Sequence, residues 1–198
     1  MICILCLAGC DSKASKEEVS LTLTSSESAN TGLEEVETIG DVDVDKGLFD
    51  VTITLPKDFV GEITQDALNA SVKEKGYQSA TLNDDGSVTF VMTKAQHKEV
   101  MQETKNQINN SLKEMVGSET YPNITSITAN DNFSHFEIVT KNTSPDMAES
   151  FAALNLYIYG GMYATFNGEP VGNIHVDYIN ADSGEVISSA DSDNMKND

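Results

Sequence analysis

The sequence predicts an α+β domain in which a mainly antiparallel sheet of about seven strands carries three helices on one face. Short segments that alternate apolar and polar residues, as half-buried strands do, occur mostly in pairs joined by turns rich in Asn, Asp and Gly. Three longer segments, with apolar residues at three- and four-residue steps, separate these pairs and are typical of helices. The predicted order is one strand followed by three αββ units, in a single domain over residues 46–191.

The first predicted strand alternates apolar and polar residues and ends at Pro56. In the αββ unit that follows, we expect a helix over 63–75. We expect its hairpin to consist of strands 77–82 and 87–93, joined by the turn Asn83-Asp84-Asp85-Gly86. The second unit consists of a helix over 94–116 and strands 123–129 and 133–140.

The third predicted helix is apolar around most of its circumference, which places it centrally in the core. Ser144 is its expected N-cap and Pro145 its first helical residue. The Gly160-Gly161 pair within it favours a kink or close packing over a ligand site. Strands 173–180 and 185–190 complete the domain.

The outward face of the sheet is expected to be polar, as in many ligand-binding surfaces and in many that are merely solvated. The residues expected there are Thr52, Thr54, Thr89, Thr125 and Ser188.

The composition argues against nucleic acid as a partner. The formal charge is −20, and all 12 basic residues are lysine. Binding to phosphate backbones needs a basic stripe, and bidentate recognition of phosphate or guanine needs arginine. An acidic surface also repels anionic lipid headgroups, so attachment to a membrane would need another means.

The N-terminus resembles the signal segment of bacterial lipoproteins. Residues 2–8 are apolar and uncharged, and Leu7-Ala8-Gly9-Cys10 resembles the lipobox that ends such signals. The resemblance implies cleavage before Cys10 and a diacylglyceryl group on its thiol. Residues 1–9 would then be a signal peptide. Such signals usually begin with basic residues, and since these are missing here, we expect the segment to be truncated. The alternative is an apolar N-terminal strand or helix that packs on the domain.

Cys10 is followed by an acidic segment that we expect to be a disordered tether over residues 10–45. Residues 11–45 contain ten acids and two lysines and are poor in aromatic residues. Such a segment buries too little apolar surface to offset the entropy of ordering. We also expect residues 192–198 to be a disordered tail. Two acyl chains on Cys10 would anchor the chain to a lipid bilayer at the extracytoplasmic face.

Two histidines and two acids are candidate metal ligands. His135 and Glu137 share a face of one predicted strand, and His175 and Asp177 share a face of another. If the two strands were neighbours with these faces aligned, the four side chains could bind zinc or manganese. Exposed polar positions on half-buried strands explain the pattern equally well. His97 lies on the apolar stripe of its helix, where we expect a boundary histidine with one ring nitrogen satisfied.

No catalytic motif is evident, and all cysteines lie at or before Cys10, which leaves no cysteine nucleophile in the domain. The sequence therefore favours a non-catalytic module that binds a protein or glycan at the cell surface, with no cofactor. One alternative is an envelope or extracellular hydrolase with a carboxylate pair. Another is a structural or assembly factor of the envelope, which would expose a large apolar patch.

The segment 177–187, Asp-Tyr-Ile-Asn-Ala-Asp-Ser-Gly-Glu-Val-Ile, is similar to hairpins of uncharacterised lipoproteins from Gram-positive gut bacteria. Some of these lipoproteins are classified close to the N-terminal part of streptococcal surface adhesins. The resemblance implies a role in surface interaction and no particular site residues.

Overall fold

The structure, a computed structural model, describes residues 42–197, with side chains described as far as Met195. The described elements, in chain order, are β1 (Asp43–Lys46), β2 (Asp50–Leu55), α2 (Lys57–Val60), α3 (Gln65–Lys75), β3 (Ser79–Leu82), β4 (Val88–Thr93), α4 (Lys94–Met115), β5 (Ile124–Ala129), β6 (His135–Thr140), α5 (Met147–Phe166), β7 (His175–Asn180), β8 (Val186–Asp191) and the 3-10 helix η1 (Ser192–Asn197).

The α+β class and the repeated αββ order are confirmed, but the single seven-stranded sheet is not. The described strands form two four-stranded sheets, in the orders β1-β2-β4-β3 and β5-β6-β7-β8. The separation follows from α4, because Thr93 ends β4 and is also the N-cap of this helix. At 1.5 Å per residue, its 22 residues carry the chain roughly 33 Å before the next strand begins.

The strand pairings are antiparallel within each sheet except for one. β6 and β7 pair in parallel, with His135 opposite His175 and Thr140 opposite Asn180. Parallel neighbours need a crossover, and α5 provides it by carrying the chain back between the two strands.

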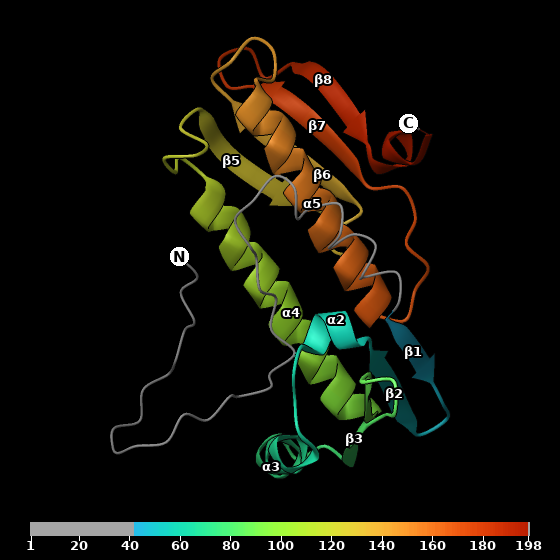
Figure 1. Ribbon diagram of the computed structural model, residues 1–198. Helices are drawn as coiled ribbons and strands as arrows, with labels where there is room; N and C mark the ends of the chain where they lie inside the picture. The colour runs from blue at the N-terminus through green and yellow to red at the C-terminus, as the bar shows by residue number, and fades with distance from the viewer. Residues whose placement is uncertain (1–41, 198) are drawn as a thin grey trace, which may run out of the picture.

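The two long helices join the two sheets into one body. Figure 1 shows α4 and α5 side by side, with β1–β3 at one end of the pair and β5–β8 toward the other. Val100 of α4 and Phe166 of α5 belong to a core cluster with the first sheet. Leu112 of α4 and Leu156 of α5 belong to a second cluster with the other sheet. Each sheet therefore buries its inner face against the same two helices.

None of the helices in the described part of the chain is both long enough and apolar enough to span a membrane.

Several boundaries differ from those predicted by a few residues, and three of the differences change what a segment is expected to do. β1 uses Asp43 to Asp45, which we expected in the tether, and η1 lies where we expected a disordered tail. β1 is ordered because it pairs with β2 and because Val44 packs against the first cluster. Asp146, rather than Ser144, is the N-cap of α5, so the helix begins two residues after Pro145.

The start of α5 is fixed by a capping box. The Asp146 carboxylate accepts a hydrogen bond from the Glu149 backbone N–H at 2.9 Å. The Glu149 carboxylate accepts one in return from the Asp146 backbone N–H, also at 2.9 Å. Glu149 is buried, and it also accepts hydrogen bonds from Thr140 and Asn142. The side chains of Asp146 and Glu149 thus satisfy backbone N–H groups that have no partner within the helix. Ser144, the predicted cap, does not take this role.

One glycine of the pair in α5, Gly160, lies in a close helix–turn contact, in line with the close packing that the sequence favours. A Cβ atom on Gly160 would lie 2.3 Å from the carbonyl oxygen of Phe133, in the turn between β5 and β6. Phe133 has a positive φ of 55° and is buried against Tyr163, with ring centroids 4.9 Å apart. Only glycine at position 160 lets this turn approach the helix so closely.

One ring nitrogen of His97 is satisfied, as the sequence predicted, but the residue is buried instead of lying at the boundary of the core. Its side chain is buried, and its Nε2 lies 2.8 Å from the carbonyl oxygen of Phe166. The neutral imidazole donates its Nε2–H to this oxygen. Burial lowers the pKa of His97, because the charged form loses hydration. The contact ties the first turns of α4 to the last turn of α5.

The outer face of the first sheet carries the predicted threonines. Thr52, Thr54 and Thr89 alternate with buried residues, and the hydroxyls of Thr54 and Thr89 lie 3.1 Å apart. In the second sheet Thr125 is exposed as expected, but Ser188 lies opposite the buried Tyr178, on the side that faces α5. The register shifts between Tyr178 and Ile179, and a one-residue slip reverses the faces of a strand.

Candidate functional site

The outer face of β6, β7 and β8 brings together two histidines and two aspartates. His135 lies opposite His175 in the parallel pair, and His175 lies opposite Asp191 in the antiparallel pair. Asp177 lies two residues beyond His175, on the same face. Side chains two residues apart point the same way on a strand, so the three strands place these groups side by side. We call His135, His175, Asp177 and Asp191 the histidine–aspartate cluster.

Asp177 is central to this cluster. Its Oδ2 lies 3.0 Å from Nε2 of His135, and its Oδ1 lies 3.1 Å from Nε2 of His175. Ser189 donates a hydrogen bond to Asp177 Oδ1 at 2.6 Å. The Asp177 side chain is 19% exposed, against 43% for His135. The carboxylate is therefore held partly within the sheet surface, with the imidazoles closer to solvent.

Asp191 holds the other side of His175. Its Oδ1 lies 2.8 Å from Nδ1 of His175 and accepts a hydrogen bond from Asn173 Nδ2 at 2.6 Å. The two imidazole rings are 5.3 Å apart between centroids. The order Asp191, His175, Asp177, His135 thus alternates acid and base across the sheet.

The pKa values in the cluster reflect these contacts. The hydrogen bond to Asp191 raises the pKa of His175 above its ordinary value, and Asp177 adds to the shift. The same bond lowers the pKa of Asp191. Partial burial opposes ionisation of Asp177, but the hydrogen bonds from Ser189 and the imidazoles outweigh it and lower its pKa. The aspartates are therefore anionic near neutral pH.

The structure brings together three of the four predicted candidate ligands. One nitrogen from each of His135 and His175 and one oxygen from Asp177 lie within 4.8 Å of one another. Glu137 lies beside Asp177 in the pairing of β6 and β7, but its Oε2 accepts a hydrogen bond from Thr128 of β5 at 3.2 Å. Glu137 is therefore on the predicted face but outside the cluster. Imidazole nitrogen and carboxylate oxygen are ligands suited to zinc and related transition metals.

Asp191 is the residue that the sequence analysis missed. The predicted last strand ends at residue 190, one position too early. A regular hairpin from the turn at 181–184 would place residue 190 opposite His175, and the register shift between Tyr178 and Ile179 brings Asp191 there instead.

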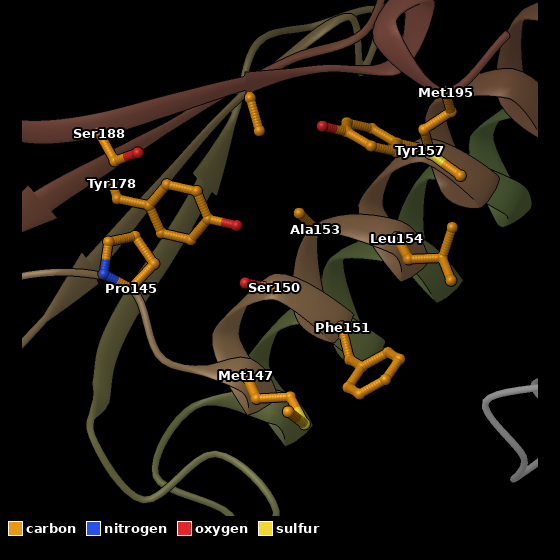
Figure 2. A pocket seen from close by; sticks show the side chains of 11 residues that line it. Pro145, Met147, Ser150, Phe151, Ala153, Leu154, Tyr157, Tyr178, Ser188 and Met195 are labelled. Carbon is orange, nitrogen blue, oxygen red and sulfur yellow. The ribbon is translucent and has the colours of Figure 1, made fainter. Parts of the chain in front are cut away.

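A second feature is an open apolar hollow of about 420 Å³ on the inner side of the same sheet. Figure 2 shows its wall of α5 side chains, facing Tyr178, Ser188 and Met195. Met147 and Phe151 at its edge are 77% and 42% exposed. Burial raises the pKa of Tyr157 in this wall to about 12, so its phenol stays protonated. The remaining lining residues are Pro145, Ser150, Ala153, Leu154 and Ala190.

Comparison with known proteins identifies no relative. No protein-family model, no curated protein and no solved structure matches the chain. Cys10, the predicted lipidation site, lies outside the described residues. The lipobox and the similarity of the hairpin to gut-bacterial lipoproteins stay predictions from sequence.

Proposed function

We propose that this chain is a lipid-anchored, non-catalytic binding protein at the extracytoplasmic face of a bacterial membrane. The observation that carries the proposal is Leu7-Ala8-Gly9-Cys10 at the end of an apolar run and before a long acidic segment. Cleavage before Cys10 and diacylglyceryl transfer to its thiol would leave two acyl chains, enough for stable anchoring.

The outer face of β6, β7 and β8 supports the binding role. It presents paired donors and acceptors on three adjacent strands, and these strands hold them at fixed spacing. Four described carboxyls have a perturbed pKa, those of Asp85, Asp131, Asp177 and Asp191, and in each the pKa is lowered. A glycosidase acid needs the opposite shift, so the hydrolase alternative gains no support from these residues.

Mass spectrometry of the protein extracted from native membranes tests the anchor. The expected N-terminal peptide begins at Cys10 and carries the mass of a diacylglyceryl group. Cys10→Ala should appear in the soluble fraction with residues 1–9 retained. A wild-type chain that is soluble and uncleaved would overturn the proposal.

A second candidate function is binding of an apolar partner at the hollow beside α5. The specific observation is that Met147, Phe151 and Met195, three large apolar side chains, are exposed at its edge. Exposed apolar patches mark interaction sites more often than isolated apolar residues do. This arrangement fits the role in envelope assembly that was considered from sequence.

A neutral dye tests the hollow. Nile red fluorescence should rise with the wild-type chain and fall in a Met147→Ser/Phe151→Ser variant, which removes apolar surface from the hollow. The matched control is Leu48→Ser/Phe49→Ser, since these residues are 86% and 81% exposed in the β1–β2 turn. An equal loss in the control would mean that the dye reports general surface apolarity.

A further inference from the structure

We propose that His135, His175 and Asp177 bind a divalent transition metal ion, zinc by preference, on the outer face of β6 and β7. The inference rests on the proposed binding role and names a ligand for that face, but it does not depend on the lipid anchor. Figure 1 shows β6, β7 and β8 side by side in the sheet that carries the site.

The ligand atoms already lie close to the spacing that zinc requires. Tetrahedral zinc, with bonds of about 2.0–2.2 Å, places its ligand atoms roughly 3.3 Å apart. Oδ2 of Asp177 lies 3.0 Å from Nε2 of His135, which meets this spacing, whereas the 3.1 Å contact with Nε2 of His175 is made by the other carboxylate oxygen, Oδ1. One atom from each of the three residues lies within 4.8 Å of the others, so binding an ion requires these atoms to approach one another by at most about 1.5 Å. His135 is 43% exposed and has room to rotate.

The backbone beneath the site is held on both sides. β6 lies between β5 and β7, and β7 lies between β6 and β8, so neither ligand-bearing strand is an edge strand. On the inner face of the same two strands, Phe136 and Val176 are paired with each other and fully buried, and they anchor the strands in the core. Sites built on such strands keep their geometry better than sites built on loops.

Groups around the ligands leave the right atoms available for a metal. In the neutral tautomer whose Nδ1–H donates to Asp191, Nε2 of His175 carries no proton, so its lone pair can bind the ion in place of its present contact with Oδ1 of Asp177. A carboxylate that orients a ligating histidine in this way is a recurring feature of zinc sites. Ser189 donates to Oδ1 of Asp177, which leaves Oδ2 as a ligand. Asp191 and Ser189 are thus positioning residues.

The donor set determines the class of metal. Two imidazoles and one carboxylate suit zinc and its neighbours, whereas calcium and magnesium require oxygen ligands throughout. Three protein ligands leave the fourth position of a tetrahedral ion to water or to a group from a partner. Such an ion could therefore bridge this face to a second molecule.

Zinc titration of the full chain tests the proposal, with Cys3, Cys6 and Cys10 replaced by serine because thiolates bind zinc by themselves. This background also removes the anchor, so the result does not depend on lipidation. Calorimetry should show saturable binding of zinc chloride with a stoichiometry near one, and no binding of calcium chloride. Nitrogen-15 NMR of the imidazoles should show shifts at His135 and His175, with His97 unchanged.

Single-residue variants of the same chain locate the site. His135→Ala, His175→Ala and Asp177→Ala should each abolish saturable binding, and Asp191→Asn should weaken it about 10–100-fold. Glu137→Gln is the matched control, since it changes a carboxylate on the same face outside the cluster and should bind as before. Circular dichroism without metal verifies that each variant is folded. Absence of saturable heat with the wild-type residues, or equal binding after His135→Ala and His175→Ala, would overturn the metal site while leaving the anchor proposal intact.

Discussion

Gly160 shows how one residue controls the approach of a turn to a helix. Gly160→Ala would place Cβ 2.3 Å from the Phe133 carbonyl oxygen and 2.9 Å from Cδ1 of Ile174. Backbone cannot move aside as a flexible side chain can. We therefore expect the free energy of unfolding to fall by about 1–3 kcal/mol. Urea denaturation measures the change.

The neighbouring glycine is the control for this experiment. A Cβ on Gly161 would meet only Cγ1 of Val171, at 3.6 Å, an ordinary contact. Alanine is the better helix former by about 0.5–1 kcal/mol, so Gly161→Ala should be neutral or slightly stabilising. Similar destabilisation by both variants would show that the Phe133 contact is not the cause.

His97 should make the stability of the fold depend on pH. Burial depresses its folded-state pKa below the ordinary value of 6.5, so the unfolded chain binds its proton more readily. Its contribution is complete above pH 6.5 and is lost as pH falls from there toward the folded-state pKa. Between pH 7.5 and 5, wild type should lose more stability than His97→Gln, whose amide can still donate to Phe166.

The other titrating groups are common to both proteins and cancel in this comparison. His175 acts with the opposite sign, because its raised pKa contributes stability at low pH that is lost as pH rises through that pKa. Equal pH profiles for wild type and His97→Gln would contradict the assignment. Chemical denaturation at each pH provides the free energies.

The candidate site was predictable in part at the level of residues. Alternation along two strands placed His135 with Glu137 and His175 with Asp177, because the side-chain period of a strand is two. Sequence could not decide whether β6 and β7 are neighbours, since that pairing depends on the crossover through α5. It also could not show that Thr128 on β5 binds the Glu137 carboxylate.

At the level of elements, the start of α5 offers a direct test of its cap. Asp146→Ala removes the acceptor for the Glu149 backbone N–H and should lower the free energy of unfolding by about 1 kcal/mol. Ser144→Ala, at the position expected from sequence, should leave it unchanged. Thermal unfolding of the two variants beside wild type measures both effects, and a larger loss at Ser144 would contradict the observed cap.

The individual elements followed from local signals, whereas their arrangement did not. Apolar periodicity and turn residues located every αββ unit, because period and turn chemistry are local properties. β1 was missed because its acidic, four-residue sequence has little strand character, and it is ordered by pairing with β2 and contact with the core. The split into two sheets depends on the length of α4 and on the packing of its two halves.

At the scale of the whole molecule, the shared helices predict a single cooperative unfolding transition. α4 and α5 each contribute side chains to both core clusters. Leu156→Ala removes a fully buried side chain from the second cluster and should cost about 2–5 kcal/mol. The amides of Ile53 in the first sheet and Val176 in the second should then lose equal protection against hydrogen exchange. Loss confined to Val176 would mean that the two sheets unfold independently.

The β1–β2 hairpin determines how the molecule responds to mechanical load. Asp43 pairs with Thr54 at the open end of the hairpin, and Lys46 pairs with Val51 next to the turn. Tension that enters at Val42 therefore breaks the cross-strand hydrogen bonds one after another instead of shearing them together. β2 keeps its partner β4 while β1 peels away, which releases its four residues, roughly 13 Å of chain. A pull from the N-terminal side thus detaches β1 first, together with the contacts of Val42 and Val44 with the first cluster, while β2 and the second cluster stay in place.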